Sequence, residues 1–142
     1  MRLLAASIAA LAALAAGSAQ GAGNQGVVGS VTVNPLSVDV TVPTDPIKTG
    51  RWFRINASVA NAAPTPLDNV SVTLVHPAAL QLGSPDAQTI PRVPALGSKP
   101  AKWDACSNVP GSYVVVARVA LKAYVSESSA KIVQVVQSKG SC

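Results

Sequence analysis

The sequence predicts an all-β protein, an immunoglobulin-like two-sheet antiparallel sandwich of seven or eight strands. Three observations support this prediction. Short β-branched runs recur at regular spacing, turn-forming Pro, Gly, Asn and Asp stand between them, and almost no segment has the periodicity of a helix. An α/β architecture would need helices between its strands, which leaves a small β-barrel as the structural alternative.

The expected strands follow one another along the chain with alternating apolar and polar positions. The clearest alternation lies in residues 52–60, where Phe53, Ile55, Ala57 and Val59 share one face and Arg54 points to the other. The apolar run 27–33 ends at a proline, and residues 80–82 are expected to form a short edge strand. We expect strands at 27–33, 38–42, 52–60, 70–74, 80–82, 103–106, 113–124 and 131–137.

Two segments between these runs are predicted to lack strands. Residues 86–102 contain Pro91, Pro94, Gly97 and Pro100, so we expect this stretch to be mostly irregular. Residues 126–129 are expected to form a turn before the last strand.

The first 21 residues differ from the rest and are predicted to be a signal peptide. Arg2 precedes an apolar Ala- and Leu-rich run of residues 3–16, and Gly17, Ser18 and Ala19 follow as small residues. Cleavage is expected after Ala19, or else near Gly21, and an uncleaved anchor is the alternative, although the run is shorter than the ~20 residues that span a bilayer. The prediction leaves one domain over residues 22–142 and places the protein outside the cell or in the periplasm.

The charge of the mature chain argues against nucleic-acid binding. Without Arg2, ten Lys and Arg stand against six Asp and Glu, which gives a net charge of +4. The cations are spread out, with no run of four or more, whereas nucleic-acid proteins usually concentrate them on one face. A mildly basic soluble surface is the simpler interpretation.

Cys106 and Cys142 are the two cysteines of the chain. An even count in an exported protein predicts a disulfide, because oxidising compartments let the bond persist. Closing such a loop stabilises the fold by about 4 kcal/mol in the chain-entropy model. Free thiols or a disulfide to another molecule are the alternatives.

Several segments together resemble CARDB-like (cell-adhesion-related) and alpha-galactosidase-associated bacterial β-sandwich modules. The resemblance rests on RINASVAN at 54–61, LDNVSVTL at 67–74, HPAAL at 76–80, IPRVPALG at 90–97, a Trp at 103 and PGSY at 110–113. It covers about residues 28–125 and implies an immunoglobulin-like accessory module, of a kind often appended to larger surface proteins and linked to cell adhesion. Ala62 and Ala63 depart from the glycine usual in these modules, and the cysteine pair is not a general feature of them.

Residues for catalysis are scarce. His76 is the sole histidine and precedes a proline at a strand end, where a surface loop residue is the simplest interpretation. A nucleophilic pair of Cys106 and His76 competes with the disulfide, and the carboxylates are scattered beside turns. No zinc spacing or EF-hand loop is present. We therefore expect no enzyme activity, no metal site and no cofactor.

Two features suggest binding. Trp52 lies beside Arg51 and Arg54, in the alternation phase opposite the apolar face, which suits a sugar ring or a partner surface; a Trp packed at the sandwich rim is the structural alternative. Residues 132–137 form an uncharged run of high β-propensity, expected to be the last strand and, if it lies at an edge, a template for strand addition.

The sequence thus predicts an exported, non-catalytic binding or interaction module of the cell envelope or exterior. Its expected partner is a protein or glycan surface, with no nucleic acid and no membrane span after signal cleavage. The alternative function is a structural subunit that assembles with its own copies through the C-terminal strand.

Overall fold

The computed structural model describes residues 33–142, of which Asn34–Cys142 form one compact unit. The predicted signal peptide and the predicted strand at 27–33 lie outside the described residues, except that Val33 is exposed and belongs to no strand. The ten strands are β1 (Leu36–Thr41), β2 (Ile47–Lys48), β3 (Phe53–Asn61), β4 (Leu67–Val75), β5 (Leu80–Leu82), β6 (Ala87–Val93), β7 (Ser98–Ser107), β8 (Gly111–Leu121), β9 (Tyr124–Glu127) and β10 (Lys131–Val136).

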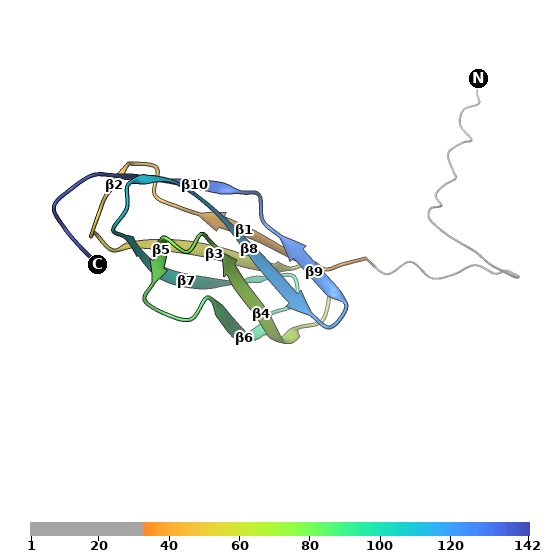
Figure 1. Cartoon of the computed structure of the whole chain (residues 1–142). Helices are drawn as coiled ribbons and strands as arrows, with labels where there is room; N and C mark the ends of the chain where they lie inside the picture. The colour runs from red at the N-terminus through yellow and green to blue at the C-terminus, as the bar shows by residue number, and fades with distance from the viewer. Residues whose placement is uncertain (1–32) are drawn as a thin grey trace, which may run out of the picture. The chain divides into compact units, whose positions relative to one another are not determined.

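The strands form two sheets (Figure 1). The four-stranded sheet has the order β1-β3-β7-β5, and the six-stranded sheet has the order β2-β10-β8-β4-β6, with β9 also paired to β8. All pairs are antiparallel except β2 and β10, which run parallel because the chain crosses from one sheet to the other after β1. The predicted immunoglobulin-like sandwich is confirmed. Three of the observed strands, β2, β6 and β9, have no separate counterpart among the expected ones.

The prediction of an irregular stretch at 86–102 is wrong, because this stretch contains β6 and the first half of β7. Proline lacks an N–H for the ladder and is tolerated in sheets at edges. Pro91 lies in β6, which pairs only with β4, and Pro100 lies where β7 pairs with β3 alone. The prolines thus mark open edges of the two sheets.

The run expected at 113–124 is interrupted by a two-residue hairpin turn at Lys122 and Ala123, since Leu121 pairs with Tyr124. Lys122 occupies the left-handed region at φ 55°. The turn expected at 126–129 is therefore only partly correct, because β9 continues to Glu127.

The core lies between the sheets and is built by the alternation that the sequence displays. Phe53, Ile55, Ala57 and Val59 of β3 are all buried, and so is the inward face of β8 opposite them. Trp103 of β7 is the largest fully buried side chain. Fully burying a Val, Leu or Ile side chain stabilises a fold by about 1.5–3 kcal/mol, so this face decides the orientation of each strand. Among the described residues, no helix is long and apolar enough to span a bilayer.

Tyr113 makes a contact typical of immunoglobulin-like sandwiches at the start of β8. Its hydroxyl donates a hydrogen bond to the carbonyl of Val109, four residues upstream, as in a tyrosine corner. Ser107 Oγ lies 3.1 Å from the Tyr113 hydroxyl and accepts from the Val109 N–H at 3.1 Å. These bonds fix the turn between β7 and β8.

Candidate functional site

A tight turn between β2 and β3 brings two cations together. The Arg51 N–H donates to the Lys48 carbonyl at 3.1 Å, and Gly50 adopts φ 78°, the left-handed value that the third residue of a type II turn requires. Lys48 and Arg51 are the first and last residues of this turn, so their Cα atoms lie within about 7 Å of each other.

The backbone of this turn is held on both sides by other strands. The Thr49 N–H donates to the Val136 carbonyl at 2.9 Å, and the Gly50 N–H donates to the Ser107 carbonyl at 2.9 Å. The Thr49 hydroxyl donates to the Ser138 carbonyl at 3.0 Å and accepts from the Ser138 N–H at 2.8 Å. The turn is therefore bonded to β7 and to the C-terminal end of β10.

Residues 137–142, the C-terminal tail, pass over this turn and end beside the beginning of β3 (Figure 1). Gly50 and Gly140 pack backbone against backbone, because a Cβ on Gly50 would lie 2.1 Å from the Gly140 carbonyl carbon. The tail ends in the disulfide between Cys106 and Cys142, whose Cα atoms are 6.0 Å apart, and the Cys142 N–H donates to Asn108 Oδ1 at 2.6 Å. The pairing expected from the sequence is thus present, and Cys106 is fully buried.

Trp52 follows the turn and points away from the core, with half of its surface (50%) exposed. The ring lies against Gly83, just beyond β5, where a Cβ would be 3.3 Å from Trp52 Cζ3. The Gly83 N–H donates to the Asp104 carbonyl at 2.8 Å, which fixes the backbone under the ring. Trp52 is therefore supported on one side and free on another.

Arg54 lies on the same outer face but is occupied by a partner in the neighbouring strand. Its Nε donates to Asp104 Oδ1 at 2.8 Å, directly across the β3–β7 ladder. This hydrogen bond raises the pKa of Arg54 above its ordinary value. Of the three predicted ligand-binding residues, the structure brings Trp52 and Arg51 to one hollow and leaves Arg54 in an ion pair beside it.

The hollow beside Trp52 has a volume of about 280 Å³ and is lined by Pro46, Ile47, Lys48, Arg51 and Trp52. Within residues 33–142, neither Lys48 nor Arg51 takes part in an ion pair; the pairs there join Arg54 with Asp104, Arg92 with Asp68 and Arg118 with Glu127. An indole and two cations that have no ion-pair partner among the described residues thus line one concave surface. We call residues 46–48 together with Arg51 and Trp52 the 46–52 surface.

Lys48 is the residue of this surface that the sequence analysis missed. Its signal was the Thr-Gly pair at 49–50, which marks a turn and so places residues 48 and 51 side by side. The predicted site counted Arg54 instead, because alternation along β3 cannot show that Asp104 pairs with it.

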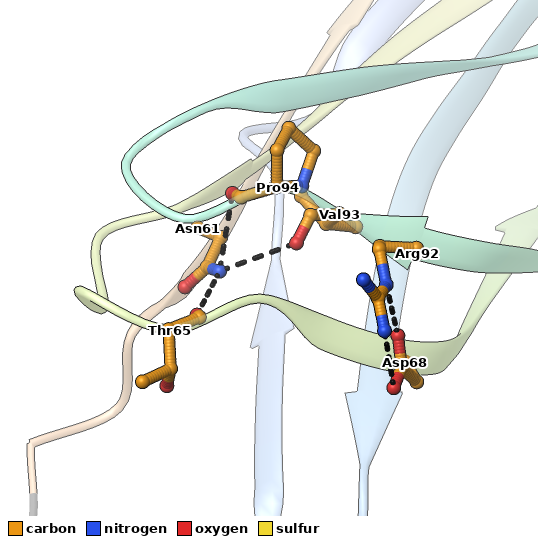
Figure 2. A network of polar contacts seen from close by, with 6 residues as sticks. All are labelled: Asn61, Thr65, Asp68, Arg92, Val93 and Pro94. Carbon is orange, nitrogen blue, oxygen red and sulfur yellow. Dashed lines mark hydrogen bonds and ion pairs between the residues drawn. The ribbon is translucent and has the colours of Figure 1, made fainter.

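The opposite end of the sandwich contains a polar network centred on Asn61 (Figure 2). The Asn61 side chain is buried, and its Nδ2 donates to the carbonyls of Thr65 at 2.9 Å and Pro94 at 3.2 Å, with Val93 O at 3.4 Å. Its Oδ1 accepts from the Ala63 N–H at 2.8 Å. One amide therefore joins the β3–β4 loop to the β6–β7 loop, which is a structural role.

Arg92 and Asp68 lie close to this network in Figure 2 and join β6 to β4 on the surface. Arg92 Nε and Oδ1 of Asp68 are 2.7 Å apart, and a second contact joins Arg92 Nη2 to Oδ2 at 3.3 Å. The hydrogen bond from Arg92 lowers the pKa of Asp68. Both charges are used within the fold and are not free for a ligand.

The loop tips at this end also form a hollow, but one without charged side chains. It measures about 390 Å³ and is lined by Ala60, Asn61, Ala62, Leu96, Gly97 and Ser98. Leu96 is 73% exposed at φ 53°, and its N–H donates to the Ala63 carbonyl at 3.0 Å. Because this hollow is larger than the one at Trp52, chemistry rather than volume distinguishes the 46–52 surface.

The described residues do not form a catalytic arrangement around the candidates from the sequence. His76 is half-buried, with Nδ1 2.9 Å from the Pro77 carbonyl, and Cys106 is held in the disulfide, so the two cannot act as a thiolate–imidazole pair. In the part of the chain from residue 33 onward, no three His, Cys, Asp or Glu side chains gather as metal ligands would.

Comparison with known proteins relates this chain to others through its fold. No family model and no curated protein matches the sequence. Among solved structures, the CARDB domain of PF1109 from Pyrococcus furiosus is similar in a solution structure (TM-score 0.53, 14% identity, 72% of this chain and 94% of that one). A crystal structure of that domain in complex with di-metal ions gives a TM-score of 0.55 and 16% identity over 71% of this chain and 87% of that one.

The C-terminal part of alpha-2-macroglobulin from Escherichia coli, which begins at domain MG7, is similar as well. It gives a TM-score of 0.58 and 15% identity over 73% of this chain and 17% of that one. At such low identities the likeness concerns the fold alone. This chain thus has the immunoglobulin-like sandwich fold seen in the CARDB domain and in the macroglobulin.

Proposed function

We propose that this protein is an exported, non-catalytic binding module of the cell envelope or exterior, and that it binds through the 46–52 surface. The observation that carries the proposal is the exposed Trp52 beside Lys48 and Arg51, two cations without an ion-pair partner in the described part of the chain, on a turn that the disulfide-linked tail holds in place.

Export is supported by the basic and apolar start of the chain and by the disulfide, since disulfides persist in oxidising compartments. Intact mass spectrometry of the protein from its native host tests export directly. A mass that matches cleavage near Ala19 and is two hydrogens lighter than the dithiol form is expected. An uncleaved mass would contradict the proposal.

Binding through the 46–52 surface is supported by its rigidity as well as by its chemistry. Binding to a turn whose backbone is already fixed costs less conformational entropy than binding that must first order a loop. Here two backbone hydrogen bonds, two hydrogen bonds of the Thr49 hydroxyl and the Gly50–Gly140 contact hold the turn before any ligand arrives.

The test is binding of the labelled mature protein to isolated envelope material, with Trp52→Ala compared against Leu96→Ala. Both residues are exposed and apolar. Trp52 directly precedes β3, whereas Leu96 is bonded to Ala63 just after the other end of that strand, so Leu96→Ala controls for general hydrophobic adhesion. We expect Trp52→Ala to reduce binding and Leu96→Ala to leave it unchanged. Equal binding by all three proteins would refute the assignment of the surface.

A second candidate function, a structural subunit that assembles with its own copies, is favoured by one observation on β10. This strand pairs with β8 along Lys131–Val135 but with β2 only at Val135 and Val136, so within the described residues 131–134 lack a second neighbour. Ile132 and Val114 are paired across the strands and exposed beside this edge. Open edges with β-branched residues are templates for strand addition.

Light scattering coupled to size exclusion decides this second candidate. Assembly that grows with concentration and disappears in Ile132→Lys is expected of a subunit, because a charge at an edge opposes strand pairing. A strict monomer at all concentrations would rule it out.

A further inference from the structure

We infer that the ligand of the 46–52 surface is an acidic saccharide, whose sugar ring stacks on Trp52 and whose acid group lies between Lys48 and Arg51. The inference rests on the proposed function and adds the chemical class of the ligand. Three features of the surface lead to it.

The first feature is a half-exposed indole that rests against the backbone at Gly83. The Trp52 ring is held from one side at Gly83, where the missing side chain lets the indole approach the backbone, and 50% of the residue remains exposed. Aromatic rings of this kind provide a large apolar contact area with a polar N–H at the edge. A pyranose ring matches it, because one face of the ring carries mainly C–H groups.

The second feature is a pair of cations whose Cα atoms are held close together by one turn. Lys48 and Arg51 close the same turn and line the same hollow, and neither is neutralised by an ion pair within residues 33–142. Asp45, two residues before Ile47, is the acidic residue nearest in sequence. A guanidinium fork binds carboxylate, sulfate or phosphate through two parallel hydrogen bonds, and the ammonium adds a point charge.

The third feature is the size of the hollow. About 280 Å³ between Pro46 and Trp52 has room for one or two sugar residues, and the hollow is open to solvent, so a longer saccharide can extend beyond it. Neutral sugars would leave both cations without a partner, and a peptide made of acidic residues alone would offer no ring to the indole. A saccharide with an acid group uses every part of the surface.

The experiment compares charged and uncharged forms of the same polymer. Affinity electrophoresis or calorimetry of the mature protein uses dextran sulfate against dextran, and a polyuronate against its carboxyl-reduced form, so that sulfate and carboxylate are separate arms. Poly-glutamate is the control for an acidic peptide. We expect binding to at least one acidic polysaccharide, none to the neutral forms, and weakening as salt rises because the charges are exposed.

Two variants test the residues of the 46–52 surface, and two control variants remove a positive charge or an exposed apolar side chain elsewhere on the protein. Trp52→Ala and Lys48→Ala/Arg51→Ala are each expected to reduce affinity by about tenfold or more. Lys99→Ala and Leu96→Ala, exposed residues outside this surface, are expected to change it less than about twofold. Unchanged urea midpoints in all variants show that the fold is retained.

The outcomes separate the inference from the function on which it rests. Three outcomes would each overturn the inference: equal binding to the neutral polymers, binding to poly-glutamate that Trp52→Ala leaves intact, or no binding to any acidic saccharide. In each case, Trp52-dependent binding to envelope material would still support the proposed function. If envelope binding is also independent of Trp52, both are wrong.

Discussion

Replacing Cys142 by Ser removes the disulfide without disturbing the core, because Cys142 is the exposed last residue whereas Cys106 is fully buried. In the folded protein the bond fastens the C-terminal tail across the turn at Thr49 and Gly50. In the unfolded chain it closes a loop between residues that are 36 positions apart. Cys142→Ser therefore acts mainly on the entropy of the unfolded state.

The size of the effect follows from the length of that loop. The chain-entropy model for a separation of 36 residues gives about 4 kcal/mol at 25 °C. The tail also gains freedom in the folded variant, since it keeps only hydrogen bonds such as Ser138 N–H to Thr49 Oγ1. We therefore expect the free energy of unfolding to fall by about 2–4 kcal/mol.

Equilibrium urea unfolding followed by tryptophan fluorescence measures this change, because Trp103 is 1% exposed in the fold and becomes solvated on unfolding. The wild type under a dithiol reductant is expected to match Cys142→Ser, and the reductant is expected to leave the variant unchanged. Comparing the double variant Cys106→Ala/Cys142→Ser with Cys142→Ser measures the packing that the buried Cys106 side chain contributes apart from the disulfide. A difference below about 0.5 kcal/mol between Cys142→Ser and wild type would refute the reasoning.

Three further predictions concern polar contacts elsewhere in the sandwich. Asn61→Ala removes the buried amide that donates to the carbonyls of Thr65 and Pro94, and it is expected to lower the free energy of unfolding by about 2 kcal/mol in urea titrations; an unchanged midpoint would contradict the role of the amide. Tyr113→Phe removes the hydroxyl that binds the Val109 carbonyl and should cost about 1 kcal/mol by the same assay, with no loss of the β-sheet signal in circular dichroism. Because Arg92 lowers the folded-state pKa of Asp68, their pair stabilises the fold above the ordinary aspartate pKa of about 4, and that contribution is lost as pH falls through the lowered value. The difference in thermal midpoint between wild type and Arg92→Gln should therefore shrink in acid, and a difference independent of pH would contradict the assignment.

The sequence by itself determined the features that depend on local order along the chain. Alternation with a period of two placed Phe53, Ile55, Ala57 and Val59 in the core, because successive side chains of a strand point to opposite faces. The same alternation put Trp52 on the outer face, and the even cysteine count predicted the Cys106–Cys142 bond. These inferences needed no knowledge of which strands are neighbours.

The prolines of residues 86–102 predicted an irregular stretch, but β6 and the first half of β7 lie there. A proline excludes a strand only where its missing N–H faces a partner. Pro91 and Pro100 lie at edges, and which strands become edges is decided by the order of all strands in the sheets.

Only the tertiary structure decided the composition of the candidate site. Lys48 lies beside Trp52 because β2 pairs with β10 and the C-terminal tail is bonded to the turn between β2 and β3. Arg54 is not part of the site because β7 places Asp104 opposite it, and the two form an ion pair. Asn61 likewise finds its acceptors in a loop more than thirty positions away, at Val93 and Pro94. Side-chain direction follows from local periodicity, but side-chain partners follow from long-range register, which the packing of the whole sandwich sets.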